Sequence, residues 1–385
     1  MTSWRIPFTR VHLTGREADY LQQVMESNHF SGDGPFTRRC EEWLERETGS
    51  TRALLTNSGT AALEMAAILL GAGEGDEVIM PSFTFASTAN AFVLRGMRPV
   101  FVDIDPHTAN IDPAQTAAAV TPRTRAIVPV HYAGNACDMD ALGEIARRSG
   151  LVIIEDAAQA LLSTYRDRPL GSIGAMSAIS FHQTKNVTAG EAGALLVNDR
   201  SLIERAEVVR EKGTNRSRFY RGEVDKYTWL DIGSSYLPGE LIAAFLFAQL
   251  ERAEEITARR LAIWEQYHAA LEPLETEGLL VRPPRTAAGD RGNAHLYFIL
   301  LRSLEERTEL TDALRSKGIA AVFHYVPLHS APAGLRFGRA VGSLPVTDDV
   351  SARLLRLPLW PDMTPDDVDL VVNAVAAALR VPTRA

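Results

Sequence analysis

Residues 151–159, Leu-Val-Ile-Ile-Glu-Asp-Ala-Ala-Gln, decide the fold of this chain. The apolar run predicts a strand that is covered on both faces and that delivers the carboxylate of Asp156 at its carboxyl end. Open α/β sheets bind their ligands at that edge. A lone aspartate after a strand can also cap the next helix, so the neighbouring segments have to decide between a cap and a ligand-binding group.

A lysine follows a second apolar strand in the same way. Residues 177–186 are Ser-Ala-Ile-Ser-Phe-His-Gln-Thr-Lys-Asn, and Lys185 lies twenty-nine residues after Asp156. A partly desolvated lysine has a lowered pKa and can attack an aldehyde, a reaction that is closed to arginine. The 40 basic residues include only four lysines: Lys185, Lys212, Lys226 and Lys317. The last of these precedes a glycine, as at a helix C-terminus, and the two before it lie in polar loop sequence.

A third segment joins the end of a strand to the start of a helix. Residues 56–62 are Thr-Asn-Ser-Gly-Thr-Ala-Ala. Such a turn can aim backbone N–H groups and the helix dipole at a phosphate, although Ser and Thr are also ordinary helix caps. Together the three segments offer a phosphate cradle, a carboxylate for a ring nitrogen and an amine for a Schiff base. Pyridoxal 5'-phosphate needs these three groups, so the set predicts that cofactor.

Between about residues 50 and 200, short apolar runs alternate with helical patterns. Strands are expected at 52–56, 77–80, 99–104, 125–130, 151–155, 175–181 and 194–198, with helices such as 61–70 and 139–149 between them. This alternation indicates βαβ units, and therefore an α/β fold with a mainly parallel central sheet.

The flanking segments complete the predicted architecture. Residues 16–27 and 36–48 are expected to form two amphipathic helices, and residues 240 to about 274 one long helix. A chain of 385 residues is too long for one compact core. We expect N-terminal helices and a large domain over 1–250, and a smaller C-terminal α+β domain over 251–385.

Composition excludes several classes of protein. The net charge is −8 and basic residues are not concentrated, which argues against a nucleic-acid partner. The densest apolar stretch, Leu241 to Leu250, is too short to span a membrane, and the N-terminus lacks a secretion signal. Cys40 and Cys137 have no ligand or redox spacing, so we expect buried thiols, no metal site and a cytoplasmic protein. A nicotinamide enzyme is disfavoured because no Gly-x-Gly-x-x-Gly follows a strand near the N-terminus.

At this point the sequence resembles a known family, the DegT/DnrJ/StrS-type sugar aminotransferases of the PLP-dependent transferase fold type I (aspartate aminotransferase-like). The matching segments are residues 58–62, 81–85, 155–159 and 180–186. Within that family the chain looks most like the WecE-type dTDP-4-keto-6-deoxyglucose 4-aminotransferases. This closer likeness covers nearly the whole chain and includes residues 32–40, 128–134, 211–217, 224–229, 231–236 and 322–325.

The resemblance implies a role for each matching residue. Lys185 would carry the cofactor as a Schiff base, Asp156 would bind the pyridine nitrogen, and Gln159 would lie beside the ring hydroxyl. Phe85 would stack on the ring. Residues that would hold the phosphate are Ser58, Gly59, Thr60 and Ser180. These enzymes are homodimers whose active sites lie at the subunit interface, and a loop of the neighbouring subunit reaches the phosphate, commonly through Asn; the matching residue here is Ser235.

The resemblance also implies a substrate. It points to transamination from L-glutamate to the C4 ketone of dTDP-4-keto-6-deoxy-D-glucose, with Lys226, Tyr227, His324 and Tyr325 in segments that contact the nucleotide sugar. Some family members replace the lysine by histidine and act as dehydratases, but Lys185 argues against that. A different keto sugar, an inosose, or a PLP-binding regulatory protein without turnover are the alternatives. The sequence leaves open whether the product amine is axial or equatorial.

Overall fold

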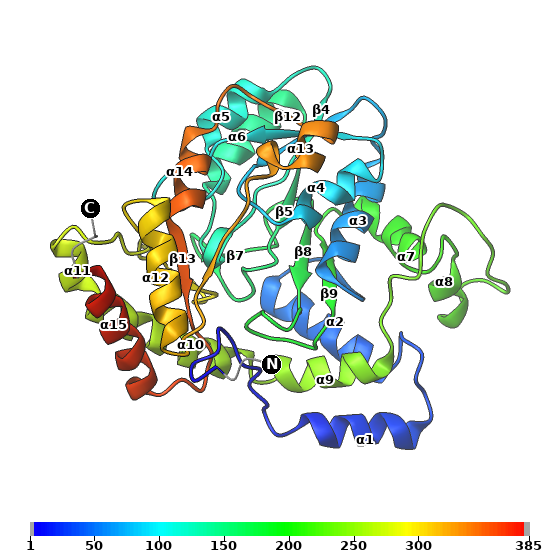
Figure 1. Ribbon diagram of the computed structural model, residues 1–385. Coiled ribbons are helices and arrows are strands. Elements are labelled where there is room, and N and C mark those ends of the chain that lie inside the picture. Colours follow the sequence, from blue (N-terminus) through cyan, green and yellow to red (C-terminus); the bar gives the residue numbers. More distant parts are fainter. Residues whose placement is uncertain (1–3, 381–385) are drawn as a thin grey trace.

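The computed structural model describes residues 4–380, which form a three-layer α/β unit joined to a smaller α+β unit (Figure 1). An eight-stranded sheet has the order β1-β9-β8-β5-β4-β2-β3-β12. Strand β9 runs antiparallel to both of its neighbours, and the other pairs in the sheet are parallel. The prediction of a mainly parallel sheet is confirmed. The strands are β1 (Arg52–Thr56), β2 (Glu77–Pro81), β3 (Arg98–Val102), β4 (Thr124–Ile127), β5 (Val152–Asp156), β8 (Met176–Ser180), β9 (Gly193–Val197) and β12 (Arg339–Ala340), with a separate hairpin of β6 (Thr164–Tyr165) and β7 (Arg168–Pro169).

Side chains alternate between two buried faces of this sheet. Leu55 packs in one apolar cluster with helices α2, α6 and α9, whereas Leu54 packs in another with α3 and α7. Because both faces are covered, the strands are apolar throughout rather than alternating with polar residues. The helices of this unit are α1 (Glu17–Ser27), α2 (Pro35–Thr48), α3 (Gly59–Leu70), α4 (Ala86–Val93), α5 (Pro113–Ala119), η1 (Tyr132–Gly134), α6 (Met139–Ser149), η2 (Arg200–Leu202), α7 (Ile203–Arg210), α8 (Arg216–Tyr220) and α9 (Glu240–Leu250).

The C-terminal part has a core of its own around a three-stranded antiparallel sheet with the order β10-β13-β11. Its elements are α10 (Ala253–Ala270), α11 (Glu272–Thr276), β10 (Tyr297–Leu300), α12 (Leu304–Ser316), β11 (Val322–Phe323), η3 (Leu328–Ser330), α13 (Pro332–Phe337), α14 (Pro345–Arg353), β13 (Leu354–Leu357) and α15 (Pro365–Leu379). The two parts exchange segments, because Ile6 packs in the C-terminal core and β12 extends the large sheet beside β3. The division into domains 1–250 and 251–385 stays a prediction.

The expected long helix from residue 240 to about 274 is wrong, because this stretch forms three helices, α9, α10 and α11. The chain leaves helical geometry at Arg252, with φ −114° and ψ 10°, and Pro273 lies in the first turn of α11, where a missing N–H is tolerated. Helix α9 packs on α1 and α2, whereas α10 packs on α15 in the C-terminal part.

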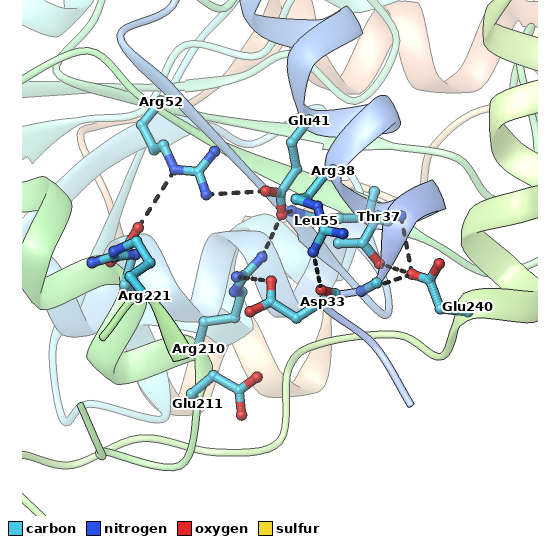
Figure 2. Close-up of polar contacts among 12 residues, drawn as sticks. Asp33, Thr37, Arg38, Glu41, Arg52, Leu55, Arg210, Glu211, Arg221 and Glu240 are labelled. Atoms are coloured by element: carbon cyan, nitrogen blue, oxygen red, sulfur yellow. Dashed lines mark hydrogen bonds and ion pairs between the residues drawn. The ribbon is translucent and has the colours of Figure 1, made fainter. Parts of the chain in front are cut away.

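Residues 211–238, here called the arm, project from the large unit around α8 (Figure 1). Large hydrophobic side chains of the arm are exposed, namely Phe219, Tyr220, Tyr227, Trp229, Leu230 and Ile232. Arm and helix layer meet at Arg210, the last residue of α7, whose buried guanidinium pairs with Glu41 of α2 and with Asp33 (Figure 2). Arg52 of β1 pairs with Glu41 as well, at 3.1 Å. The base of the arm is therefore fixed, while its surface is not covered.

None of the helices within residues 4–380 combines the length and the apolar character that crossing a membrane requires.

Candidate active site

A cavity of about 680 Å³ lies at the carboxyl ends of the parallel strands and is also lined by residues of the C-terminal sheet. Ten of the residues singled out by the sequence line it: Ser58, Gly59, Thr60, Phe85, Asp156, Gln159, Ser180, Lys185, His324 and Tyr325. Strands β1, β5 and β8 bring the three segments of the sequence argument together, since each of them ends at this edge of the sheet.

Asp156 is the last residue of β5 and is buried, with 5% of its surface exposed. Its carboxylate is fixed by two donors: Thr88 Oγ1 donates to Oδ2 at 2.7 Å, and the backbone N–H of Ala158 donates to Oδ1 at 3.2 Å. Thr88 in turn lies 2.9 Å from the hydroxyl of Thr84. These two contacts hold both oxygens of the Asp156 carboxyl group in place inside the cavity.

Lys185 lies five residues after the end of β8, in a turn closed by its backbone N–H donating to the carbonyl of His182 at 2.8 Å. Burial of the amine, assisted by the nearby charge of Arg356, lowers the pKa of Lys185 to about 8, against the opposing effect of Asp156. An amine with this pKa is partly neutral near pH 7.5, which a nucleophile and proton acceptor requires.

Small residues and a helix N-terminus form a cradle after the end of β1. Ser58 caps α3 by accepting a hydrogen bond from the N–H of Ala61 at 3.0 Å. The N–H groups of Gly59 and Thr60, the first two residues of α3, have no acceptor within the helix and are available to a ligand. A Cβ atom at Gly59 would lie 2.9 Å from Cβ of Ser180, so glycine at this position lets the start of α3 approach the end of β8. Backbone N–H groups, hydroxyls and a helix dipole suit a phosphate.

Gln159 and two aromatic residues line another wall of the cavity. Gln159 Nε2 donates to the hydroxyl of Tyr325 at 3.1 Å, and its Oε1 accepts from the N–H of Ala133 at 2.8 Å. The ring of His324 stacks on Tyr325 with centroids 3.7 Å apart. Burial, with the charges of Arg356 and Lys185, lowers the pKa of His324 to about 2, so this imidazole is neutral. Phe85 also lines the cavity and is 62% exposed, which leaves its ring free to cover a ligand.

Three predicted residues do not lie in this cavity. Lys226, Tyr227 and Ser235 belong to the arm and are exposed. Ser235 is held through its backbone, which pairs with Glu211 and accepts a long hydrogen bond of 3.4 Å from the side chain of Asn57. These three side chains therefore take no part in the cavity of their own chain.

Two residues of the cavity that bear on its chemistry, Thr88 and Arg356, were not predicted from the sequence. Thr88, which fixes Asp156, gives no local signal because a buried threonine is common in helices. Arg356 does give one, since it is a charged residue within the apolar strand β13, Leu354–Leu357. A charge inside an otherwise apolar strand is rarely tolerated without a partner.

These features define a class of protein. The cradle at α3, the buried carboxylate of Asp156 and the low-pKa amine of Lys185 fit the phosphate, the ring nitrogen and the aldehyde of pyridoxal phosphate. Because glycine at position 59 and the open N–H groups of α3 leave room for a phosphate, the residues present fit the cofactor. The protein is a PLP-dependent aminotransferase of fold type I.

Comparison with known proteins makes the assignment specific. The chain belongs to the DegT/DnrJ/EryC1/StrS aminotransferase family, whose model matches residues 12–376. The spore coat polysaccharide biosynthesis protein SpsC of Bacillus subtilis (strain 168) is 36% identical over 381 residues, 96% of each chain. The structure of the aminotransferase TlmJ from Streptoalloteichus hindustanus is similar with a TM-score of 0.89 and 30% identity, covering 98% of both chains. Spr1654 from Streptococcus pneumoniae, solved in a PLP form, has a TM-score of 0.89 and 26% identity over 97% of this chain and 98% of its own. The predicted fold, enzyme class and cofactor are confirmed.

Proposed function

We propose that this enzyme transfers the amino group of L-glutamate to the C4 ketone of a nucleotide-linked sugar, dTDP-4-keto-6-deoxy-D-glucose, and forms a dTDP-4-amino-4,6-dideoxyhexose. The observation that carries the chemistry is the meeting of Lys185 and Asp156 in one buried cavity. SpsC is a protein of spore coat polysaccharide biosynthesis, and Spr1654 is a proposed sugar aminotransferase. Both support a sugar as the amine acceptor.

The position of each residue in the cavity indicates its role in the proposed reaction. When bound, the cofactor supplies an electron-poor ring that stabilises the carbanion left after a proton is removed next to nitrogen. Asp156, fixed by Thr88 and the N–H of Ala158, would hold a proton at the ring nitrogen. Lys185 would hold the cofactor through its amine and, when free and neutral, would remove and return the substrate proton. The α3 N-terminus and Ser180 would hold the phosphate.

The cavity's charge suits anionic ligands. Among the described residues, its lining includes the cations Lys185, Arg260 and Arg356, against the carboxylates Asp156 and Glu191. A phosphate, a diphosphate and a carboxylate would each gain from this excess of positive charge. His324 and Tyr325, stacked and neutral, offer hydroxyl and imidazole contacts to a sugar.

We also propose that the enzyme is a homodimer, and the exposed surface of the arm supports this. Its aromatic residues are exposed, with Trp229 at 78% and Tyr227 at 54%. Exposed apolar patches of this kind are typical of contact surfaces. A second copy that covers the arm would bring Lys226, Tyr227 and Ser235 to the neighbouring active site. A cytoplasmic location stays a prediction; Cys40 and Cys137 are buried free thiols, which a reducing compartment would preserve.

A direct assay tests the substrate. The purified enzyme, loaded with PLP and supplied with L-glutamate, is expected to aminate dTDP-4-keto-6-deoxyglucose, and NMR of the isolated product gives the configuration at C4. Nucleotide-linked 3-keto sugars and a keto-inositol are the matched competitors. A kcat/KM for one of these that exceeds the value for the 4-keto sugar would refute the proposed substrate, and absence of turnover with every ketone would favour a regulatory role.

A further inference from the structure

The arm is closed at its base, where the chain leaves α7 and where it returns toward α9. The backbone of Glu211 pairs with that of Ser235, and the carbonyl of Arg210 accepts from the N–H of Tyr236 at 3.3 Å. The outgoing and the returning segments of the arm are therefore joined to each other beside Arg210. Whatever fixes this residue fixes both ends of the arm.

The side chain of Arg210 fastens this base to the helix layer (Figure 2). Its guanidinium is 1% exposed and donates to Asp33 Oδ1 at 3.0 Å and to the carboxylate of Glu41 in α2. Glu41 Oε1 also accepts from the backbone N–H of Leu55 at 3.0 Å, and its Oε2 lies 3.1 Å from Arg52. One buried carboxylate thus joins the base of the arm to β1, the strand that leads into the phosphate cradle.

The segment that follows the arm is fastened to the same place by an opposite charge. Glu240, the first residue of α9, is buried, and its carboxylate accepts from the N–H groups of Phe36 at 2.8 Å and Thr37 at 3.0 Å. The helix dipole also favours a carboxylate at this N-terminus of α2. A Cβ atom at Gly34 would lie 2.5 Å from Cδ of Glu240, so glycine lets the turn that carries Asp33 approach α9.

Charged contacts of the rest of the arm with α7 lie at the surface. Arg205 pairs with Asp231 at 2.7 Å, with its side chain 37% exposed. Arg221 pairs with Glu207 at 3.0 Å, with its side chain 44% exposed. Exposed ion pairs contribute little, whereas breaking a buried pair is costly because it leaves a charge without compensation. The orientation of the arm therefore depends most on Arg210.

We propose that Arg210, paired with Asp33 and Glu41, is a positioning residue for the active site of the neighbouring subunit. This rests on the proposed function, in which the arm of one subunit serves the cavity of the other, and goes beyond it. An element with few buried contacts of its own is easily displaced unless its base is fixed. Arg210 does not line the cavity itself, but through the arm it sets whether Lys226 and Tyr227 reach the sugar.

Two half-reactions separate the sugar from the amine donor. The PLP-loaded enzyme reacts with L-glutamate in one, and its aminated form reacts in the other with dTDP-4-keto-6-deoxyglucose or with whichever ketone the assay above shows to be preferred. In Arg210→Gln the sugar half-reaction is expected to lose roughly tenfold or more in rate constant over Kd, whereas the glutamate half-reaction at saturating PLP stays within about threefold. Arg210→Lys is expected to recover part of the loss, because an ammonium keeps the charge but lacks the fork that pairs two carboxylates.

Mixed dimers show through which chain Arg210 acts. When Arg210→Gln and Lys185→Ala chains are unfolded together and refolded, about a quarter of wild-type activity is expected to return, because half of the random dimers are mixed. One site of each mixed dimer combines the intact Lys185 of the Arg210→Gln chain with a correctly held arm from the other chain. If Arg210 served only its own chain, that site would stay impaired. Activity no higher than that of Arg210→Gln alone would overturn the proposal.

Hydrogen exchange gives a readout that needs no substrate. In the PLP-loaded enzyme, the amides of residues 213–233 are expected to exchange roughly tenfold faster in Arg210→Gln than in the wild type, while residues 151–160 exchange equally. Asp33→Asn changes a partner that is 30% exposed, and it carries the same tests if Arg210→Gln does not fold. Its effects are expected in the same direction but smaller, because Glu41 still pairs with Arg210.

Arg339→Gln is the matched control. It removes a guanidinium from the buried carboxylate of Glu77, which lies 2.9 Å away. Glu77 keeps a second arginine, Arg123 at 3.2 Å, and the test variant likewise leaves Glu41 with a second arginine. Strand β12, which carries Arg339, is the edge of the sheet opposite β1. Thermal stability is therefore expected to fall without a change in either half-reaction or in exchange of the arm.

The remaining outcomes separate this inference from the proposed function. Unchanged exchange of the arm, or an unchanged sugar half-reaction, in both Arg210→Gln and Asp33→Asn would overturn the role of Arg210. Equal losses in Arg339→Gln would overturn it in favour of a general loss of stability. Refolding Lys226→Ala/Tyr227→Ala with Lys185→Ala tests the arm by itself. Recovery in that mixture without recovery in the Arg210→Gln mixture overturns only the positioning role, whereas failure of that mixture overturns the proposed role of the arm.

Discussion

The cavity and the arm hold all the predicted site residues, and they are built in opposite ways. In the cavity Asp156 is 5% and Gln159 6% exposed, and each has hydrogen-bond partners within the chain. On the arm Trp229 is 78% and Tyr227 54% exposed, although the arm's base is anchored by the buried Arg210. The difference indicates that the residues proposed for the bond-making chemistry are organised within one chain, whereas the substrate contacts predicted for the arm depend on the homodimer proposed above.

Removing the amine tests the cavity most severely. Lys185→Ala is expected to lower turnover by on the order of 10⁴-fold and to abolish the absorbance of the covalently bound cofactor, because both the link to the aldehyde and the proton acceptor are lost. Lys212→Ala, at an arm lysine, is the matched control. Turnover within tenfold of wild type in Lys185→Ala would refute its role.

Neutralising the carboxylate separates binding from chemistry. Asp156→Asn is expected to keep cofactor binding and to lose on the order of a hundredfold in kcat, because a neutral amide no longer holds the ring nitrogen protonated. Thr88→Val, which removes one donor to this carboxylate, should lose only several-fold. Near wild-type rates in Asp156→Asn would rule out the ring-nitrogen role.

Subunit complementation tests the arm. Tested separately, the double variant Lys226→Ala/Tyr227→Ala is expected to have a kcat/KM for the sugar that is lower by roughly tenfold or more. The variant Lys185→Ala is expected to be inactive. When the two chains are unfolded together and refolded, about a quarter of wild-type activity is expected to return. Half of the random dimers are mixed, and one of their two sites then combines an intact Lys185 with an intact arm.

The activity of the same refolded mixture could also contradict this prediction. If the arm served its own chain, mixed dimers would have no intact site and activity would not rise above that of the double variant. Size-exclusion chromatography with light scattering reports the oligomeric state independently.

The smallest expected effect is a pH dependence set by Lys185. With its pKa lowered to about 8, roughly a tenth of the amine is neutral at pH 7 and about half at pH 8, against about one part in a thousand for an ordinary lysine at pH 7.5. Covalent uptake of PLP by the cofactor-free protein should therefore rise about fivefold between pH 7 and 8 and level off above pH 9. A rate that climbs steadily to pH 10 would contradict the lowered pKa.

The sequence predictions were accurate where a local pattern decides the structure and inaccurate where distant segments decide it. Strand β1 and helix α6 have the predicted bounds, because a local apolar pattern encodes them. The single helix expected over residues 240–274 is wrong because contacts with distant segments decide this stretch. Helix α9 packs on α1 and α2, whereas α10 packs on α15. Arg356 was missed although its setting, Leu354–Leu357 with one charge inside, is readable in the sequence.

The sequence by itself determined the fold class and the cofactor and singled out Lys185 and Asp156, because strand ends and their polar residues are local patterns and a parallel sheet gathers them at one edge. Only the tertiary structure decided which groups face those two residues. The donor Thr88, the stacked pair of His324 and Tyr325, and the unpaired guanidinium of Arg356 enter the site from distant segments. A local sequence pattern does not predict such contacts. Contacts between distant segments follow from how whole layers pack and not from the spacing of neighbouring residues.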